Sequence, residues 1–204
     1  NEEYRDAVVK AMSSLYEHYR NYPWQGKSSD GYADSIESAL NLYNRETVES
    51  TAKWMDSEIK VMWAKQKPDG VIEGWWGDGN FARTTIMYCL WKTQGITIKP
   101  WQPNVYYGAV KDGEKILVTI SAKLGWRGKL IFDIPRHEKY MNMPIDWPRI
   151  NQFPQWFTVT EPNLYNVTDT LDSETKTYSA TRMARGINIT LEPGKTKKLI
   201  ISKK

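Results

Sequence analysis

The sequence predicts an α+β protein of two segments, in which antiparallel helical hairpins precede an antiparallel β-sandwich. Up to about residue 95, apolar residues recur at steps of three and four, the period of a helix with one buried face. From Gly95 onward, apolar and polar residues alternate, which is the period of half-buried strands. We therefore expect a helical-hairpin domain over residues 1–97 and a β-sandwich domain over residues 98–204.

Four helices are expected in the first segment, enough for two hairpins. Asp34 with Glu37 fits a capping box at the start of the second helix, and Thr47 can cap the third. The apolar stripe of the first helix consists of Tyr4, Val8, Ala11, Met12, Leu15 and Tyr19. The expected helices cover residues 4–19, 36–43 and 52–63, and a stretch that begins near residue 78.

The fourth helix is expected to be an inner helix, because residues 84–91 include no charged side chain. Cys89 and Leu90 should then be buried. A helix enclosed on all sides needs more neighbours than the other three helices offer. We expect the β segment, a partner chain or a region upstream of Asn1 to complete the helical domain.

The second segment predicts seven or more short strands, as in an antiparallel sandwich. The strongest signal is the Lys111-Asp-Gly-Glu114 turn between two alternating runs, which is typical of a β-hairpin. Residues 135–154 are rich in proline and are expected to form a long loop. The expected strands cover residues 105–109, 116–120, 130–134, 156–160, 164–168, 187–191 and 199–201.

The charge of the chain is divided unevenly between the two segments. Residues 1–95 carry a formal charge of −3 and residues 96–204 carry +7, within a total of +4. A basic surface attracts polyanions such as nucleic acids or acidic polysaccharides. Several lysines near the C-terminus have a second interpretation, as solubilising residues of an edge strand and tail. These are Lys195, Lys197, Lys198, Lys203 and Lys204. No apolar run reaches the roughly 18 residues that a bilayer crossing needs, so we expect no membrane partner.

The best candidate site lies in the run from Gly74 to Arg83, at the start of the fourth helix. Indole rings stack on the apolar faces of sugars, carboxylates and amides bind hydroxyl groups, and arginine pairs with anions. In the other interpretation, the aspartate caps the helix and the tryptophans fill an interface. The candidate residues are Trp75, Trp76, Asp78, Asn80 and Arg83.

Further candidates lie elsewhere in the chain. Asp30, Asp34 and Glu37 could supply carboxylates for acid–base catalysis, although the spacing of Asp34 and Glu37 also fits a cap. His137 lies beside Arg136 at the edge of the proline-rich stretch and is a candidate binding residue. The spacings of metal ligands and the glycine-rich phosphate loop are absent from the sequence, so we expect no cofactor.

Helical hairpins carrying Asp30-Gly-Tyr-Ala-Asp-Ser-Ile-Glu37 and Gly74-Trp-Trp-Gly-Asp-Gly-Asn-Phe-Ala-Arg83, followed by a β-sandwich, resemble the C-terminal part of an (α/α) toroid carbohydrate-active protein. Six-hairpin glycosidases and heparinase-like polysaccharide lyases share this plan. The resemblance implies a cleft at the entrance to the inner helices and Tyr32 as a lyase-type proton donor, in a chain that is a fragment or a reduced relative of such a protein. Asp34 and Asp78 are our candidate catalytic carboxylates. The resemblance also implies secretion or a periplasmic location. Two hairpins are fewer than a full toroid has.

Three functions are compatible with the sequence. The first is a polysaccharide lyase or glycoside hydrolase, or a fragment of one, acting on an acidic glycan. The second is a non-catalytic module that binds or assembles glycans, since no convincing acid and base pair is present. The third is nucleic-acid binding through the basic segment, which ranks last because no recognised motif accompanies the charge.

Overall fold

The computed structural model describes residues 1–73, 79–144, 147 and 153–204. The chain forms two compact units. The helical unit comprises Asn1–Cys89, and the β unit comprises Leu90–Trp147 and Gln155–Lys204. The division falls inside the fourth helix, which ends at Thr93, and the first strand begins at Ile96. None of the helices in the described ranges combines the length and apolarity of a membrane span.

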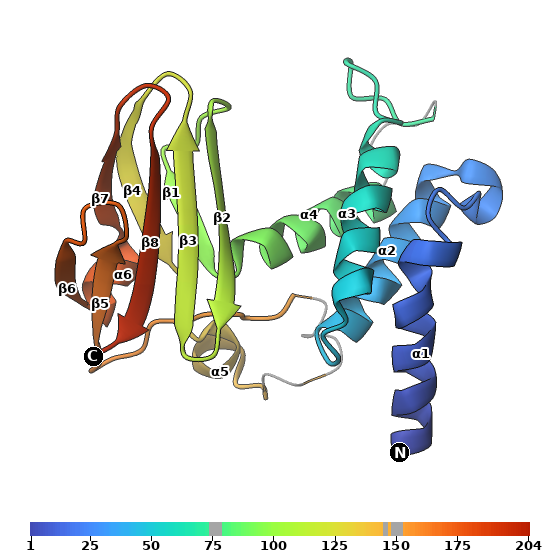
Figure 1. The fold of residues 1–204 in the computed structure, drawn as a ribbon, viewed down its shortest axis with the longest axis horizontal. Coiled ribbons are helices and arrows are strands. Elements are labelled where there is room, and N and C mark those ends of the chain that lie inside the picture. The colour runs from blue at the N-terminus through green and yellow to red at the C-terminus, as the bar shows by residue number, and fades with distance from the viewer. Residues whose placement is uncertain (74–78, 145–146, 148–152) are drawn as a thin grey trace. The chain divides into compact units, whose positions relative to one another are not determined.

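The helical unit contains α1 (Glu2–His18), the short 3-10 helix η1 (Trp24–Lys27), α2 (Ser29–Tyr43), α3 (Glu49–Trp63) and the first part of α4 (Gly79–Thr93) (Figure 1). Large apolar side chains from α1, α2 and α3 fill the interior, because each helix turns one face inward. They include Met12, Ile36, Leu40, Trp54, Met55, Ile59 and Met62, all at most 2% exposed.

The helix starts differ from the expected caps. The hydroxyl of Ser28 caps α2 by accepting a hydrogen bond from the Gly31 N–H at 3.0 Å. Asp34 therefore lies inside the helix, and the predicted capping box of Asp34 with Glu37 is wrong. The cap of α3 is Val48, with no side-chain hydrogen bond, so Thr47 does not cap it. Helix α2 begins earlier than the apolar period indicates, because the Ser28 hydroxyl satisfies the Gly31 N–H, which lies upstream of the first apolar repeat.

Helices α1 and α3 run in the same direction (Figure 1). The Thr51 hydroxyl donates to the Met12 carbonyl oxygen at 3.0 Å, and the Trp54 indole N–H donates to the Tyr19 carbonyl oxygen at 3.1 Å. From the first of these contacts to the second, residue numbers rise along both helices, so the two helices are parallel. The Trp54 bond reaches the carbonyl of Tyr19, the C-cap residue of α1, which has no partner within the helix.

Helices α2 and α4 also run in the same direction along their contact. Asn80 contacts Asp30, and further along both helices the Thr84 hydroxyl donates to the Ala33 carbonyl oxygen at 3.1 Å. Helix α3 contacts both, and a Tyr88 hydroxyl bond to Asp56 at 2.6 Å joins it to α4. Alternate helices of the unit are therefore parallel, which is the arrangement of stacked helical hairpins.

Helix α4 has one buried side and one exposed side. Phe81, Thr84 and Met87 are buried, whereas Ile86 is 53% exposed and Cys89 is exposed. Leu90 is partly exposed. The expectation of a completely enclosed helix with a buried Cys89 is therefore wrong. The lack of charge in residues 84–91 does not require enclosure, because single apolar side chains are common on protein surfaces.

The β unit consists of two antiparallel sheets that pack face to face around one core (Figure 1). The three-stranded sheet has the order β1 (Ile96–Lys99), β4 (Trp126–Phe132), β7 (Ile187–Leu191). The five-stranded sheet has the order β2 (Val105–Asp112), β3 (Lys115–Ala122), β8 (Thr196–Lys203), β5 (Leu164–Asp169), β6 (Thr175–Ser179). This architecture confirms the predicted α+β class and the sandwich.

Three details of the β unit differ from expectation. Residues 156–160 form no strand, although Phe157 and Val159 are buried in the core. β8 lies between β3 and β5, so its lysines do not mark a sheet edge. The proline-rich stretch begins with a helix, α5 (Arg136–Met141), and a further helix, α6 (Ala180–Arg185), precedes β7.

Candidate functional site

The predicted site residues fall into three groups. Trp75, Trp76 and Asp78 lie outside the described residues. Tyr32, Asp34, Asn80 and Arg83 belong to the helical unit, on α2 and α4. His137 belongs to the β unit, on α5.

Polar side chains join the starts of α2 and α4. The Asn80 amide donates to an Asp30 carboxylate oxygen, and the Arg83 guanidinium forms an ion pair with Glu37. The side chain of Glu37 is 11% exposed, whereas that of Arg83 is 41% exposed. Arg83 therefore bridges a nearly buried carboxylate and the surface. We call Asp30, Glu37, Asn80 and Arg83 the helix-start cluster.

A second set of contacts ties Glu73 to the first residue of α2. The Glu73 carboxylate accepts hydrogen bonds from the Ser29 backbone N–H at 2.9 Å and from its hydroxyl at 3.1 Å, and it pairs with the Lys65 ammonium at 3.0 Å. Burial alone would raise the pKa of Glu73, but these bonds outweigh it and hold the pKa below its ordinary value. Residues on both sides of 74–78 are therefore fixed to the start of α2.

Tyr32 lies inside the helical unit and is 2% exposed. Burial, with a contribution from the Glu58 charge, raises the pKa of its phenol. The Lys65 ammonium lies 5.5 Å from the centre of the Tyr32 ring, within the range of a cation–π contact. A catalytic proton donor must reach its substrate. In this structure, Tyr32 is a packed core residue.

The acidic side chains of the cluster already have partners. Asp30 accepts from Asn80, Glu37 pairs with Arg83, and the adjacent Glu73 pairs with Lys65. Asp34 is half-buried on α2.

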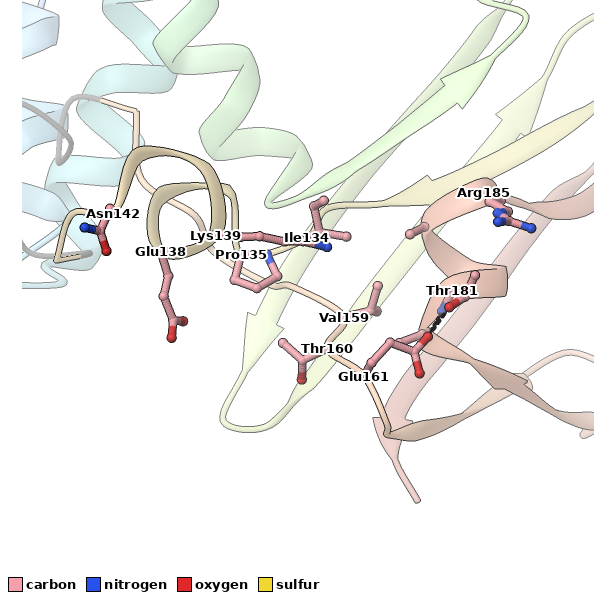
Figure 2. A pocket seen from close by; sticks show the side chains of 12 residues that line it. Ile134, Pro135, Glu138, Lys139, Asn142, Val159, Thr160, Glu161, Thr181 and Arg185 are labelled. Atoms are coloured by element: carbon pink, nitrogen blue, oxygen red, sulfur yellow. Dashed lines mark hydrogen bonds between the residues drawn. The ribbon is translucent and has the colours of Figure 1, made fainter.

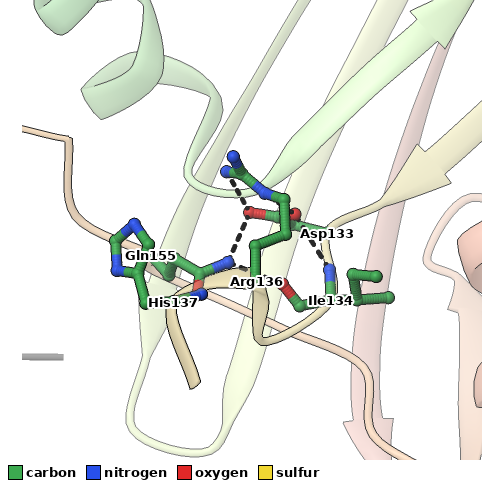
Figure 3. A network of polar contacts seen from close by, with 5 residues as sticks. All are labelled: Asp133, Ile134, Arg136, His137 and Gln155. Carbon is green, nitrogen blue, oxygen red and sulfur yellow. Dashed lines mark hydrogen bonds and ion pairs between the residues drawn. The ribbon is translucent and has the colours of Figure 1, made fainter. Parts of the chain in front are cut away.

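His137 is a buried part of a hydrogen-bond network at the start of α5, and it is 4% exposed (Figure 3). Its backbone N–H donates to the Gln155 side-chain oxygen at 3.0 Å. Burial, together with the neighbouring Arg136 charge, lowers the pKa of the imidazole. The side chain is therefore neutral at neutral pH and suits a structural position better than the binding of an anion.

Asp133 is the centre of that network. It accepts two hydrogen bonds from the Arg136 guanidinium, at 2.8 and 2.9 Å, and one from the Gln155 amide at 3.1 Å (Figure 3). Such a two-point arginine–carboxylate pair has a fixed geometry. It holds α5 against the end of β4.

A pocket of about 820 Å³ adjoins this network and was not expected from the sequence (Figure 2). Its walls come from α5, α6 and residues 159–161. Glu161 is held in place by a hydrogen bond from the Thr181 N–H at 2.6 Å, and Glu138, Lys139 and Arg185 also line the pocket. Three segments that are distant in the sequence meet here, so no local motif marks the pocket.

Within the described ranges, no group of three histidine, cysteine or acidic side chains could hold a metal ion. No known protein-family model matches the chain, and no curated protein matches it in sequence.

Proposed function

We propose that this chain is a carbohydrate-active protein that recognises an acidic glycan at the helix-start cluster. The observation that carries the proposal is the contact of Asn80 with Asp30 near the starts of two parallel helices, one helical turn before the partly exposed Arg83 on α4. The cluster combines an anion-binding group with an amide and a carboxylate that can bind sugar hydroxyls.

Arg83 is the anion-binding group of the proposed site. A guanidinium presents five N–H donors, and the ion pair with Glu37 leaves the exposed part of the group available to a ligand. The starts of α2 and α4 add the positive ends of two helix dipoles, which favour a negative ligand. A uronate carboxylate or a sulfate at this place would be attracted by the Arg83 guanidinium and by the helix dipoles.

The helix arrangement supports the resemblance to (α/α) toroid proteins. In the helical unit α1 is parallel to α3 and α2 is parallel to α4, as expected of two stacked hairpins. The proposal includes a region upstream or a partner chain that completes the helical domain, and a secreted or periplasmic location. The sugar platform expected of Trp75 and Trp76 stays a prediction.

Binding without catalysis is the second candidate. The specific observation in its favour is that Asp30 and Glu37 are held by partners while Tyr32 is in the core. A lyase or a hydrolase needs a base or an acid that reaches the substrate. Among the described residues proposed as catalytic, Asp30 and Asp34 are half-buried, and Asp30 already accepts a hydrogen bond from Asn80.

Calorimetric titration with a uronate oligosaccharide tests recognition, with a neutral oligosaccharide of equal length as the control. We expect heat of binding for the acidic ligand and a weaker affinity at higher salt, because salt screens exposed charges. Equal binding of both ligands, or of neither, would contradict the proposal. Incubation followed by measurement of reducing ends and of the double bond left by elimination then separates hydrolase, lyase and binding module.

A further inference from the structure

A hollow of about 860 Å³ lies on the outer face of the three-stranded sheet. Residues of β1, β4 and β7 line it, together with the last residue of α6. No carboxylate is among its lining residues, and its cations are Lys99, Arg127, Lys129 and Arg185. We call these four residues and their surface the basic sheet face.

The strand register places two of these cations directly opposite each other. Lys99 is the cross-strand partner of Lys129 in the β1–β4 pair, and both are exposed. Directly opposite side chains have Cβ atoms only about 4.5–5.5 Å apart, and like charges in this position destabilise a sheet. On the next strand, Lys129 has Asn188 as its partner and Arg127 has Thr190. An anion between the cations would relieve their repulsion.

Close packing beneath the surface holds the Lys129 side chain. A Cβ atom added to Gly186 would lie 2.9 Å from Lys129 Cβ, so the lysine stem lies directly against the Gly186 backbone. The Trp126 indole packs against Gly128 and donates to the Pro100 carbonyl oxygen at 3.1 Å, which joins β4 to the end of β1. The cations therefore project from a well-packed base.

The protein itself does not neutralise this surface. Within the described ranges, none of its four cations forms an ion pair. Other cations of the same unit are paired, since Arg136 contacts Asp133 and Lys197 contacts Asp169. Charge that the fold leaves uncompensated is available to an external polyanion.

We propose that the basic sheet face binds an acidic polysaccharide, with sulfate or carboxylate groups held between Lys99, Lys129 and Arg127. This goes beyond the proposed function, because the face belongs to the β unit and needs no residue of the helix-start cluster. A polysaccharide fits better than a nucleic acid. The lining contains no aromatic side chain on which a base could stack. The strands that line the face are joined in a three-stranded sheet, so they present no separate helix or two-stranded ribbon to a major groove.

The test uses heparin, a sulfated polysaccharide, as the probe and compares wild type with the double variant Lys99→Gln/Lys129→Gln. We expect the dissociation constant to rise about tenfold and the slope of log K against log salt to fall by about two, because two charge contacts are lost. The control Lys111→Gln/Lys115→Gln removes the same charge from the β2–β3 hairpin and should change binding less than about twofold.

Removing the facing lysines should not lower thermal stability, because it removes a repulsion. Should the double variant nevertheless unfold, Arg127→Gln alone gives a second reading of heparin affinity. Wild-type affinity in either folded variant would overturn the proposal, as would absence of heparin binding by the wild type. Duplex DNA that binds as tightly as heparin would overturn the choice of a polysaccharide. The same comparison made in the Arg83→Gln background separates the two proposals, since loss of Lys99 and Lys129 should weaken heparin binding by the same factor there.

Discussion

Replacement of Arg83 by glutamine separates the structural part of the helix-start cluster from its binding part. The ion pair joins a guanidinium that is 41% exposed to a carboxylate that is 11% exposed. Exposed pairs contribute about 0.2–1 kcal/mol, whereas breaking a buried pair costs about 3–5 kcal/mol. This pair lies between the two cases, so we expect Arg83→Gln to lower the free energy of unfolding by about 1–3 kcal/mol.

The double variant Glu37→Gln/Arg83→Gln provides the matched comparison. It removes both charges, so most of the lost stability should return in urea unfolding. Affinity for a uronate oligosaccharide should stay low in both variants, because each lacks the cation. If Arg83→Gln unfolds like wild type, the ion pair is not formed as described. If the double variant recovers binding together with stability, Arg83 serves the fold and not the ligand.

Three further predictions concern single residues. Burial raises the pKa of Glu58, so its ionised form destabilises the native state once the pH exceeds the ordinary carboxyl range. Glu58→Gln should increase the free energy of unfolding at neutral pH and lose this gain in acid, and urea titrations at both pH values would show it. Gly95 has φ +95°, and an added Cβ would lie 2.3 Å from the Phe157 carbonyl oxygen. Gly95→Ala should therefore cost more than the roughly 1–2 kcal/mol of a left-handed residue, and an unchanged melting temperature would contradict this. The Cys89 side chain is exposed, and partial burial of its thiol raises the pKa of that group. Native protein should react with a thiol reagent without denaturant and faster as the pH rises, and a need for denaturant would contradict the exposure.

The sequence predicted those parts of the fold that depend on local pattern. The alternation around the Lys111–Glu114 turn identified β2 and β3, because every second residue of β3 is buried from Ile116 to Ala122. β1 and β6 were not predicted, since β1 has only four residues and β6 has no buried residue. Residues 156–160 alternate like a strand, but the Val159 N–H bonds to the Asp133 carbonyl oxygen without joining a ladder.

The candidate site depends on contacts that no local pattern contains. Asn80 and Arg83 were predicted as members of one local cluster, but their partners Asp30 and Glu37 lie on α2, about fifty residues earlier. From the sequence, Glu37 was interpreted as part of a capping box, whereas in the structure it forms an ion pair with Arg83. The positive charge of the second half predicted a basic surface but not its position. The register of β1 with β4 determines that Lys99 lies opposite Lys129.

A residue-resolved NMR titration of the wild-type chain with a uronate oligosaccharide tests the central claim most directly. We predict that the backbone amide signals of Asp30, Asn80 and Arg83 shift together with a single dissociation constant, and that a neutral oligosaccharide leaves them unchanged. Signals that remain fixed at these three residues while the acidic ligand binds elsewhere, or that respond equally to the neutral ligand, would contradict recognition of an acidic glycan by the helix-start cluster.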